Sequence, residues 1–295
     1  MMALNNNLDT CAICGGELGD TVLAHDRPDR FERAAGVSEE KYRRAWVGCL
    51  SCGSATNRQK PENLRKLRNI AAQYYEVDFS GSDIGAKYSL VMSLPPHKSD
   101  NAGRVDRIIA ALTRWESLRS SKGALSVLDI GAGTGVFLSR FLGQVPGDWT
   151  GVALEPDPHA ADHLRSLELF DVKQELFTGQ PELHGFKLLT LNKVLEHIQD
   201  PKVLLEQVAA AIDPAQGLIY VEVPDVMTIG RRPPTDNILG ALHCHLYSPT
   251  GLVRLLDRAG LVVLDTGRVF EPSGKLTAFA FATCTEAAER LATRE

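Results

Sequence analysis

One stretch near the middle of the chain, Val-Leu-Asp-Ile-Gly-Ala-Gly-Thr-Gly, restricts the possible folds more than any other feature. An apolar run ends in Asp129, and three glycines follow at alternate positions, Gly131, Gly133 and Gly135. Apolar residues then recur at helical spacing over residues 136–142. A strand, a glycine turn and a helix in this order form a crevice for nucleotide-like ligands, because glycine lets the backbone approach a ligand closely.

A second acidic residue strengthens this interpretation. The strand-like run at 149–154 ends in Glu155, which follows Gly135 by about 20 residues, enough for a helix and a second strand. An acid at the tip of that strand can accept hydrogen bonds from both hydroxyls of a ribose. This chemistry suits dinucleotides and other adenosine ligands alike. The spacing G-x-G-x-G, with Asp129 two residues ahead, favours an adenosine ligand other than NAD.

Strands and helices alternate from residue 124 onward, as a doubly wound parallel sheet requires. The apolar runs predict strands at 126–130, 149–154, 171–175, 187–191 and 217–223. Helices are expected at 135–142, 158–167, 201–212 and 248–259. Two closing runs, at 261–265 and 276–282, indicate a final antiparallel pair. The predicted fold class is therefore α/β, with a mostly parallel Rossmann-like sheet and an antiparallel last strand.

Four of the six cysteines form two C-x-x-C pairs, Cys11 with Cys14 and Cys49 with Cys52. In a reducing compartment such pairs are typical of metal knuckles, and four thiolates close the tetrahedral shell of a structural Zn²⁺. A redox pair or unrelated thiols are the other interpretations. A redox C-x-x-C usually opens a helix, which the following Gly15 does not favour.

These patterns divide the chain into three parts. Residues 1–60 are expected to form a small zinc module, residues 61–123 a helical linker and active-site cover, and residues 124–295 the main domain. The linker contains Tyr75, a candidate for the active site. The zinc module carries eight basic and eight acidic residues, whereas a nucleic-acid reader normally has a basic surplus.

Composition narrows the possible partners. The 295-residue chain has a formal net charge of −5, so it lacks an overall basic field for nucleic acid. Its first ten residues lack the apolar core of a signal peptide, and no apolar run approaches the ~18 residues that suggest a membrane span. We therefore expect a cytoplasmic protein with neither a nucleic-acid nor a membrane partner. Oligomeric state is not indicated.

Three motifs together resemble those of class I S-adenosylmethionine-dependent methyltransferases. They are the glycine turn, the second-strand acid in Leu-Glu-Pro-Asp, and the segment Asn-Lys-Val-Leu-Glu-His that ends at His197. The resemblance covers roughly residues 100–285. It implies that S-adenosylmethionine is the cofactor, and that its binding residues are Asp129, Gly131, Ala132, Gly133, Gly135, Glu155, Pro156, Glu175 and Asn192. Glu175 would lie near adenine and Asn192 near the methionine end. The alternatives are a solvated surface acid for Glu175 and a turn residue for Asn192, for which the functional interpretation is favoured.

Two histidines, His243 and His245, stand in a substrate-facing position after the fifth predicted strand. Either could act as a general base or be a hydrogen-bonded structural residue. An H-x-H pair could also bind a metal ion, but no third ligand is evident nearby in the sequence. With the four-cysteine module, this segment is similar to zinc-containing deoxysugar C-methyltransferases, which show Tyr-His-Glu-His where this chain has Leu-His-Cys-His. The last histidine matches, but the acid–base Tyr and Glu are absent. The resemblance therefore implies O- or N-methylation of a carbohydrate or another small molecule, with His245, His243 and Tyr75 as catalytic candidates.

Three other functions compete with this hypothesis. A zinc-module RNA methyltransferase conflicts with the balanced charge of residues 1–60. A NAD-dependent oxidoreductase conflicts with the glycine spacing. A methyltransferase-like binding module without activity conflicts with the complete set of Asp129, the three glycines and Glu155.

Overall fold

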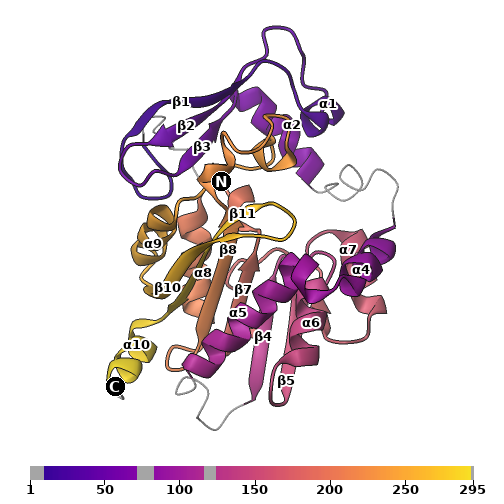
Figure 1. The fold of residues 1–295 in the computed structure, drawn as a ribbon, viewed down its shortest axis with the longest axis vertical. Helices are drawn as coiled ribbons and strands as arrows, with labels where there is room; N and C mark the ends of the chain where they lie inside the picture. The colour runs from indigo at the N-terminus through magenta and orange to yellow at the C-terminus, as the bar shows by residue number, and fades with distance from the viewer. Residues whose placement is uncertain (1–9, 72–82, 116–123, 294–295) are drawn as a thin grey trace.

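The computed structural model of the protein describes residues 10–71, 83–115 and 124–293. These ranges contain two sheets, one of four strands and one of seven. The larger sheet forms the body of the molecule, and the smaller one lies past one end of its strands (Figure 1).

The seven-stranded sheet confirms the predicted fold class. Its strands, in the order in which they lie, are β10 (Val262–Phe270), β11 (Leu276–Thr283), β8 (Leu218–Pro224), β7 (Leu188–Asn192), β4 (Leu125–Ile130), β5 (Trp149–Leu154) and β6 (Asp171–Lys173). Strands β4 to β8 run parallel, and β11 pairs antiparallel with both β8 and β10. The third strand ends at Lys173, two residues earlier than predicted, which leaves Glu175 in the following loop.

Helices cover both faces of this sheet. Because side chains alternate along a strand, Leu128 contributes to one core and Val127 to the other. The core that contains Leu128 is closed by α8 (Pro201–Ala211) and α9 (Pro249–Arg258). The opposite core is closed by α5 (Asp100–Arg114), α6 (Val136–Gln144), α7 (Pro158–Ser166) and α10 (Thr285–Ala292). None of the described helices combines the length and apolar composition needed to cross a bilayer.

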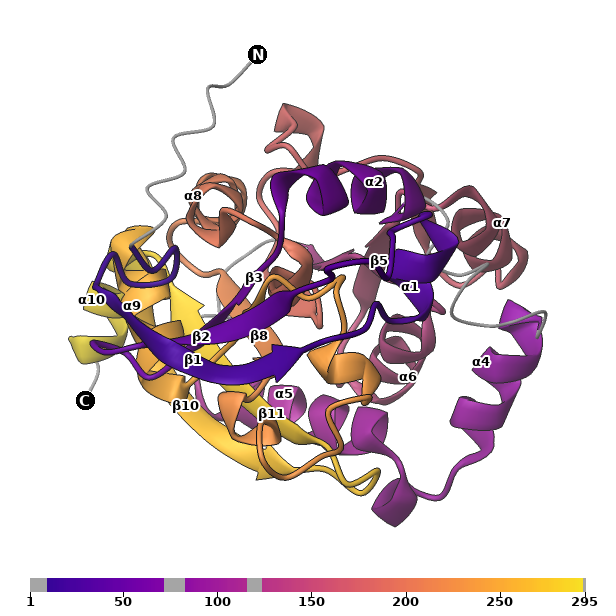
Figure 2. The ribbon, with the colours of Figure 1, turned by 90° about the horizontal axis from the view of Figure 1, so that it is seen from above.

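The smaller sheet combines three strands from the N-terminal part of the chain with one strand from a much later part. Its order is β1 (Leu18–His25), β2 (Arg44–Cys49), β3 (Ala55–Arg58) and β9 (His245–Leu246). In Figure 2 the first three strands lie nearest the viewer, across one end of the larger sheet. The sequence pattern did not reveal β9, which belongs to the later part of the chain and pairs antiparallel with β3.

The segment between the two sheets is helical where it is described. It contains α2 (Pro61–Ala71), α4 (Ile84–Ser93) and α5, and α1 (Arg30–Ala34) lies within the N-terminal module. Arg140, on α6, donates to the backbone carbonyls of Val91 and Met92, so α4 is anchored beside the helix that follows the glycine turn. A covering role for residues 61–123 stays a prediction.

Candidate functional site

The glycine turn joins β4 to α6 at the carboxyl edge of the larger sheet. Its three glycines have positive φ angles, 72° at Gly131, 57° at Gly133 and 75° at Gly135. A Cβ on Gly131 would lie 2.8 Å from Cγ2 of Val194, so no larger residue fits there without displacing its neighbour. The amides of Gly131 and Ala132 both donate to the carbonyl of Leu154, which ties the turn to the end of β5.

Glu155 lies directly against this turn. One carboxylate oxygen accepts a hydrogen bond from the amide of Gly133 at 2.9 Å, and the other accepts from the amide of Asp157 at 3.0 Å. Burial raises the pKa of Glu155, and these amide donors oppose that rise. Pro156 is exposed beside it, and Asp157 caps α7. The structure therefore brings together the acid and the glycine turn that the sequence predicted as partners.

Asp129 and Asn192 meet across the neighbouring strands β4 and β7. Oδ1 of Asp129 accepts hydrogen bonds from the Thr190 hydroxyl at 2.6 Å and from Nδ2 of Asn192 at 2.9 Å. Asp129 is almost fully buried, and this desolvation raises its pKa to about 6 despite the two donors. Oδ1 of Asn192 is also buried but accepts no hydrogen bond from any of the described residues. A buried acceptor without a donor indicates a place where a ligand's donor fits.

The remaining cofactor candidate, Glu175, is partly exposed in the loop after β6. It lies at the same edge of the sheet as Glu155, since β5 and β6 are parallel neighbours. The catalytic candidate Tyr75 lies outside the described residues.

His245 is placed in β9 with only 2% of its surface exposed. Its Nδ1 is 3.3 Å from the hydroxyl of Thr56, and its Nε2 is 3.2 Å from the carbonyl of Gln199. Burial lowers its pKa to about 4, which keeps the ring neutral. With both nitrogens engaged in internal contacts, the ring links β3 to the segment after β7. A catalytic role for His245 stays a prediction.

His243 belongs instead to a compact group with Glu196 and His197, which we call the glutamate–histidine cluster. One ligand atom from each residue lies within 4.8 Å of the others. Glu196 is buried, whereas both histidines are partly exposed. The two rings meet edge to face with centroids 4.7 Å apart.

The sequence motifs named Glu196 and His197 only as part of a resemblance, not as site residues. Their position directly after the apolar strand β7 was the available signal. The approach of His243 depends on the path of the loop before β9, which periodicity does not reveal.

A second buried acid, Glu222 on β8, anchors α5 over this edge of the sheet. Its carboxylate is 2.5 Å from Nη2 of Arg104, 3.4 Å from Nη1 of Arg107 and 3.3 Å from Nζ of Lys193. The hydroxyl of Tyr220 also donates to it, at 2.8 Å. These cations and the hydroxyl hold the pKa of Glu222 well below its usual value, although burial alone would raise it. Sequence reasoning missed this residue, because an acid inside an apolar strand carries no periodic signal.

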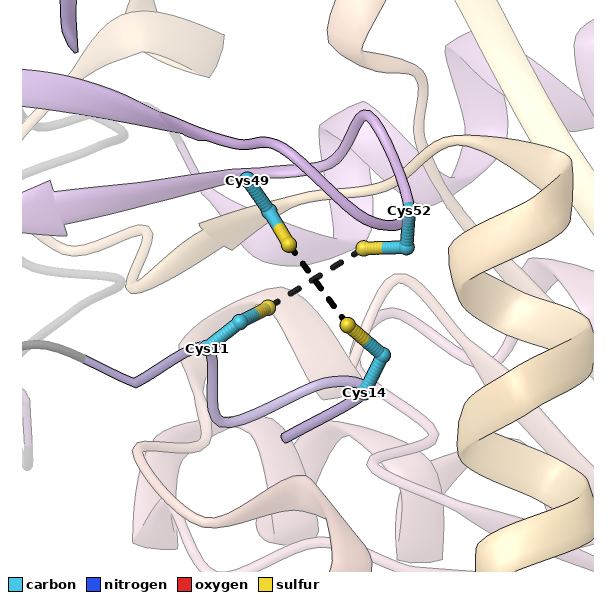
Figure 3. Close-up of side chains that lie close together, drawn as sticks. All are labelled: Cys11, Cys14, Cys49 and Cys52. Atoms are coloured by element: carbon cyan, nitrogen blue, oxygen red, sulfur yellow. Dashed lines mark hydrogen bonds between the residues drawn. The ribbon is translucent and has the colours of Figure 1, made fainter. Parts of the chain in front are cut away.

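The four cysteines of the two C-x-x-C pairs converge on one point (Figure 3). The sulfurs of Cys11 and Cys52 are 4.0 Å apart, and those of Cys14 and Cys49 are 3.5 Å apart. A tetrahedral Zn²⁺ with bonds of about 2.3 Å needs sulfurs about 3.8 Å apart. The donor type and spacing therefore fit a four-thiolate zinc site.

The cysteine cluster is packed directly against the larger domain. Arg258, on α9, donates to the carbonyls of Ala12 and Ile13 within the first cysteine turn. The hydroxyl of Ser248 donates to the carbonyl of Cys52 in the second turn. These contacts tie both ends of α9 to the cysteine turns, and the helix and the four cysteines pack in one continuous core.

The smaller sheet also holds the loop that carries His243. Asn57, at β3, donates from Nδ2 to the carbonyls of His243 at 2.8 Å and Gly240 at 3.2 Å. Arg44, on β2, donates to the carbonyl of Leu239 at 2.8 Å. The N-terminal strands therefore fix the backbone on which one member of the glutamate–histidine cluster stands.

Comparison with known proteins shows which family the chain belongs to. A family model described as "Methyltransferase domain" matches residues 97–266. The ubiquinone biosynthesis O-methyltransferase of Aeromonas salmonicida (strain A449) is 25% identical over 157 residues, which are 48% of this chain and 65% of that protein. The chain thus spans slightly less than two thirds of this curated relative.

Two solved structures have the same fold. Magnesium protoporphyrin IX methyltransferase from Synechocystis PCC 6803, with bound S-adenosylhomocysteine, has a TM-score of 0.52 and 12% identity, over 74% of this chain and 100% of that chain. The 1,6-didemethyltoxoflavin-N1-methyltransferase of Burkholderia thailandensis has a TM-score of 0.51 and 17% identity, over 81% of this chain and 96% of that chain. At these identities the likeness shows the fold alone.

Proposed function

Because this chain belongs to the methyltransferase family whose domain spans residues 97–266, we propose that it transfers a methyl group from S-adenosylmethionine to a small-molecule acceptor. The observation that carries the proposal is the junction of Asp129, Asn192, Glu155 and the glycine turn at one edge of the sheet. These residues offer buried acceptors and a closely approachable backbone side by side.

Different residues of the junction bind different parts of the cofactor. The glycine turn admits the methionine backbone, and the unpartnered Oδ1 of Asn192 suits a donor such as the α-ammonium. Glu155 accepts from the ribose hydroxyls while the Gly133 and Asp157 amides hold its carboxylate in place. When bound, the cofactor supplies an electrophilic methyl group, so the chain's main task is to align the acceptor behind it.

We place the acceptor beside the glutamate–histidine cluster, with a hydroxyl as the reacting group. His197 and His243 are partly exposed there, and Val194, three residues before His197, touches the glycine turn through Gly131. The O-methylating relative supports a hydroxyl acceptor. A carbohydrate acceptor is supported by the resemblance of the segment around His243 and His245 to sugar methyltransferases. The zinc-bound module is proposed as its structural support.

Calorimetry with S-adenosylhomocysteine and with NAD tests the cofactor. We expect binding of the first and none of the second. Glu155→Ala should weaken the binding of S-adenosylhomocysteine by roughly 1–3 kcal/mol, about 5- to 150-fold in Kd, because hydrogen bonds to a charged group are lost. Glu155→Gln keeps the side-chain size if the alanine variant is unstable, and Glu182→Ala, at an exposed acid, is the control. Binding of NAD without any response to S-adenosylhomocysteine would reverse the assignment.

A panel of acceptors then tests the substrate class. Formation of S-adenosylhomocysteine should depend on added hydroxyl-bearing small molecules, with nucleotide sugars and catechols compared directly. Turnover on RNA alone, with salt-dependent binding, would point instead to a nucleic-acid methyltransferase.

A further inference from the structure

We propose that Glu196, His197 and His243 form a binding site for a divalent cation, separate from the four-cysteine centre. Two imidazoles and one carboxylate are a common protein ligand set for Zn²⁺ and similar metals. Their ligand atoms lie within 4.8 Å of one another. Bonds of about 2.1 Å would draw them to ~3–4 Å apart, a small adjustment of side chains.

Both histidines are oriented as metal ligands usually are. Nδ1 of His243 lies 2.8 Å from the carbonyl of Ile238, and Nδ1 of His197 lies 3.2 Å from the carbonyl of Leu242. Since a carbonyl only accepts, each Nδ1 carries the ring proton and each lone pair is on Nε2. A backbone carbonyl that fixes the far nitrogen of a ligating histidine is a typical outer-shell contact.

Glu196 supplies the independent evidence that a ligand belongs here. Only 1% of its surface is exposed, and its Oε2 has no hydrogen-bond partner within residues 10–71, 83–115 and 124–293. A buried carboxylate oxygen without a partner is costly and calls for an explanation. The nearest cation on its own segment, Lys193, is held at 2.7 Å by the hydroxyl of Thr277 and at 3.3 Å by Glu222. A cation between Glu196 and the two rings would satisfy the free oxygen.

The position of the cluster suits a cation that activates the methyl acceptor, a role that rests on the proposed function. The cluster begins four residues after Asn192, whose side chain binds Asp129 at the crevice. Three protein ligands leave coordination positions open on the partly exposed side of the two rings. A hydroxyl of the acceptor bound there would lose its proton to water more readily. Its oxygen then forms a bond to the methyl carbon as the carbon–sulfur bond breaks, and the thioether leaves with both electrons.

Equilibrium dialysis of the zinc-loaded full chain against Mn²⁺, Co²⁺ and Zn²⁺ in turn tests the site without any acceptor. At least one of these ions should bind in one equivalent beyond the zinc of the cysteine cluster. His243→Ala and Glu196→Gln should each raise its Kd at least tenfold. His184→Ala, at an exposed histidine elsewhere, should leave it unchanged. Because Glu196→Gln keeps the shape of the side chain, it serves if His243→Ala does not fold.

The readout separates this proposal from the methyl-transfer proposal. Zinc content and thermal unfolding confirm that each variant keeps the cysteine cluster and its fold. If none of the three ions binds in excess of the cysteine-bound zinc, or if the extra equivalent persists in both variants, the site does not exist. Metal binding without any response to S-adenosylhomocysteine would uphold the site and overturn the function.

Discussion

The cysteine cluster and the glutamate–histidine cluster differ in their donors and in their access to solvent. Three of the four cysteines are buried, and their sulfurs have the spacing of a closed tetrahedron. The second cluster offers two nitrogens and an oxygen, and two of its three residues are partly exposed. A closed thiolate shell stabilises a fold, whereas an incomplete shell of nitrogen and oxygen leaves room for a substrate. The comparison therefore predicts a structural role for the cysteine cluster and a chemical role for the glutamate–histidine cluster.

The two clusters are nonetheless connected through the smaller sheet. Cys49 ends β2, and Asn57 on the next strand holds the backbone of His243. Loss of the first cluster should therefore disturb the second, but loss of the second should leave the first intact. The following predictions test this asymmetry.

Cys49→Ser should have the largest effect. Metal binding supplies roughly 10–16 kcal/mol in small zinc modules at neutral pH, comparable with or above the ~5–15 kcal/mol that stabilises a whole domain. The variant should lose its zinc, measured by elemental analysis. Hydrogen exchange should become fast over β1–β3 and also over β9. Cys284→Ser, at a cysteine outside the cluster, is the control. Two results would contradict a structural role for the cysteine cluster: freshly purified wild-type protein without zinc, or a variant whose strands stay protected from hydrogen exchange.

His245→Ala should have the second largest effect, and it should fall on stability. The substitution removes two hydrogen bonds and the packing of a buried ring, about 2–3 kcal/mol of unfolding free energy in denaturant melts. If the ring is only structural, turnover per folded molecule should change less than tenfold. If His245 is the general base that the sequence motif predicts, turnover would instead fall by ~10²–10⁴ at unchanged cofactor affinity, with partial recovery at higher pH.

Asn57→Ala should have the smallest effect and measures the link between the clusters. It removes the donor to the carbonyls of His243 and Gly240, about 1–2 kcal/mol of unfolding free energy. Zinc content should stay at one per chain. The affinity for Mn²⁺ or the other added ions should fall severalfold, because the loop that presents His243 is loosened. Unchanged ion affinity in a destabilised variant would show that the two clusters act independently.

The parallel core of the fold was predictable from the sequence, because buried parallel strands are continuous apolar runs. The predicted strand at 187–191 differs from β7 by one residue at each end. The same reasoning placed Asp129, Glu155 and Asn192 at one edge of the sheet, because polar residues at the ends of parallel strands meet there. Their role in cofactor binding stays a prediction. Glu175 was placed less well because β6 is short and ends before it.

The glutamate–histidine cluster could not be assembled from the sequence. Glu196 and His197 follow a strand, but His243 reaches them through an irregular loop whose path depends on distant contacts from Arg44 and Asn57. The burial of His245 escaped prediction for a related reason. Its strand is only two residues long, which is too short to show any alternation.

The late position of strand β9 in the sequence also affects how the protein folds during its synthesis. A ribosome adds about 5–20 residues per second, so roughly 10–40 s separate the emergence of β3 from that of β9. During that interval the nascent chain already contains all four cysteines, but it lacks the strand that completes their sheet. We expect the free edge of β3 to need protection from other nascent chains until His245 and Leu246 emerge, because an unpaired strand edge is a template for misassembly.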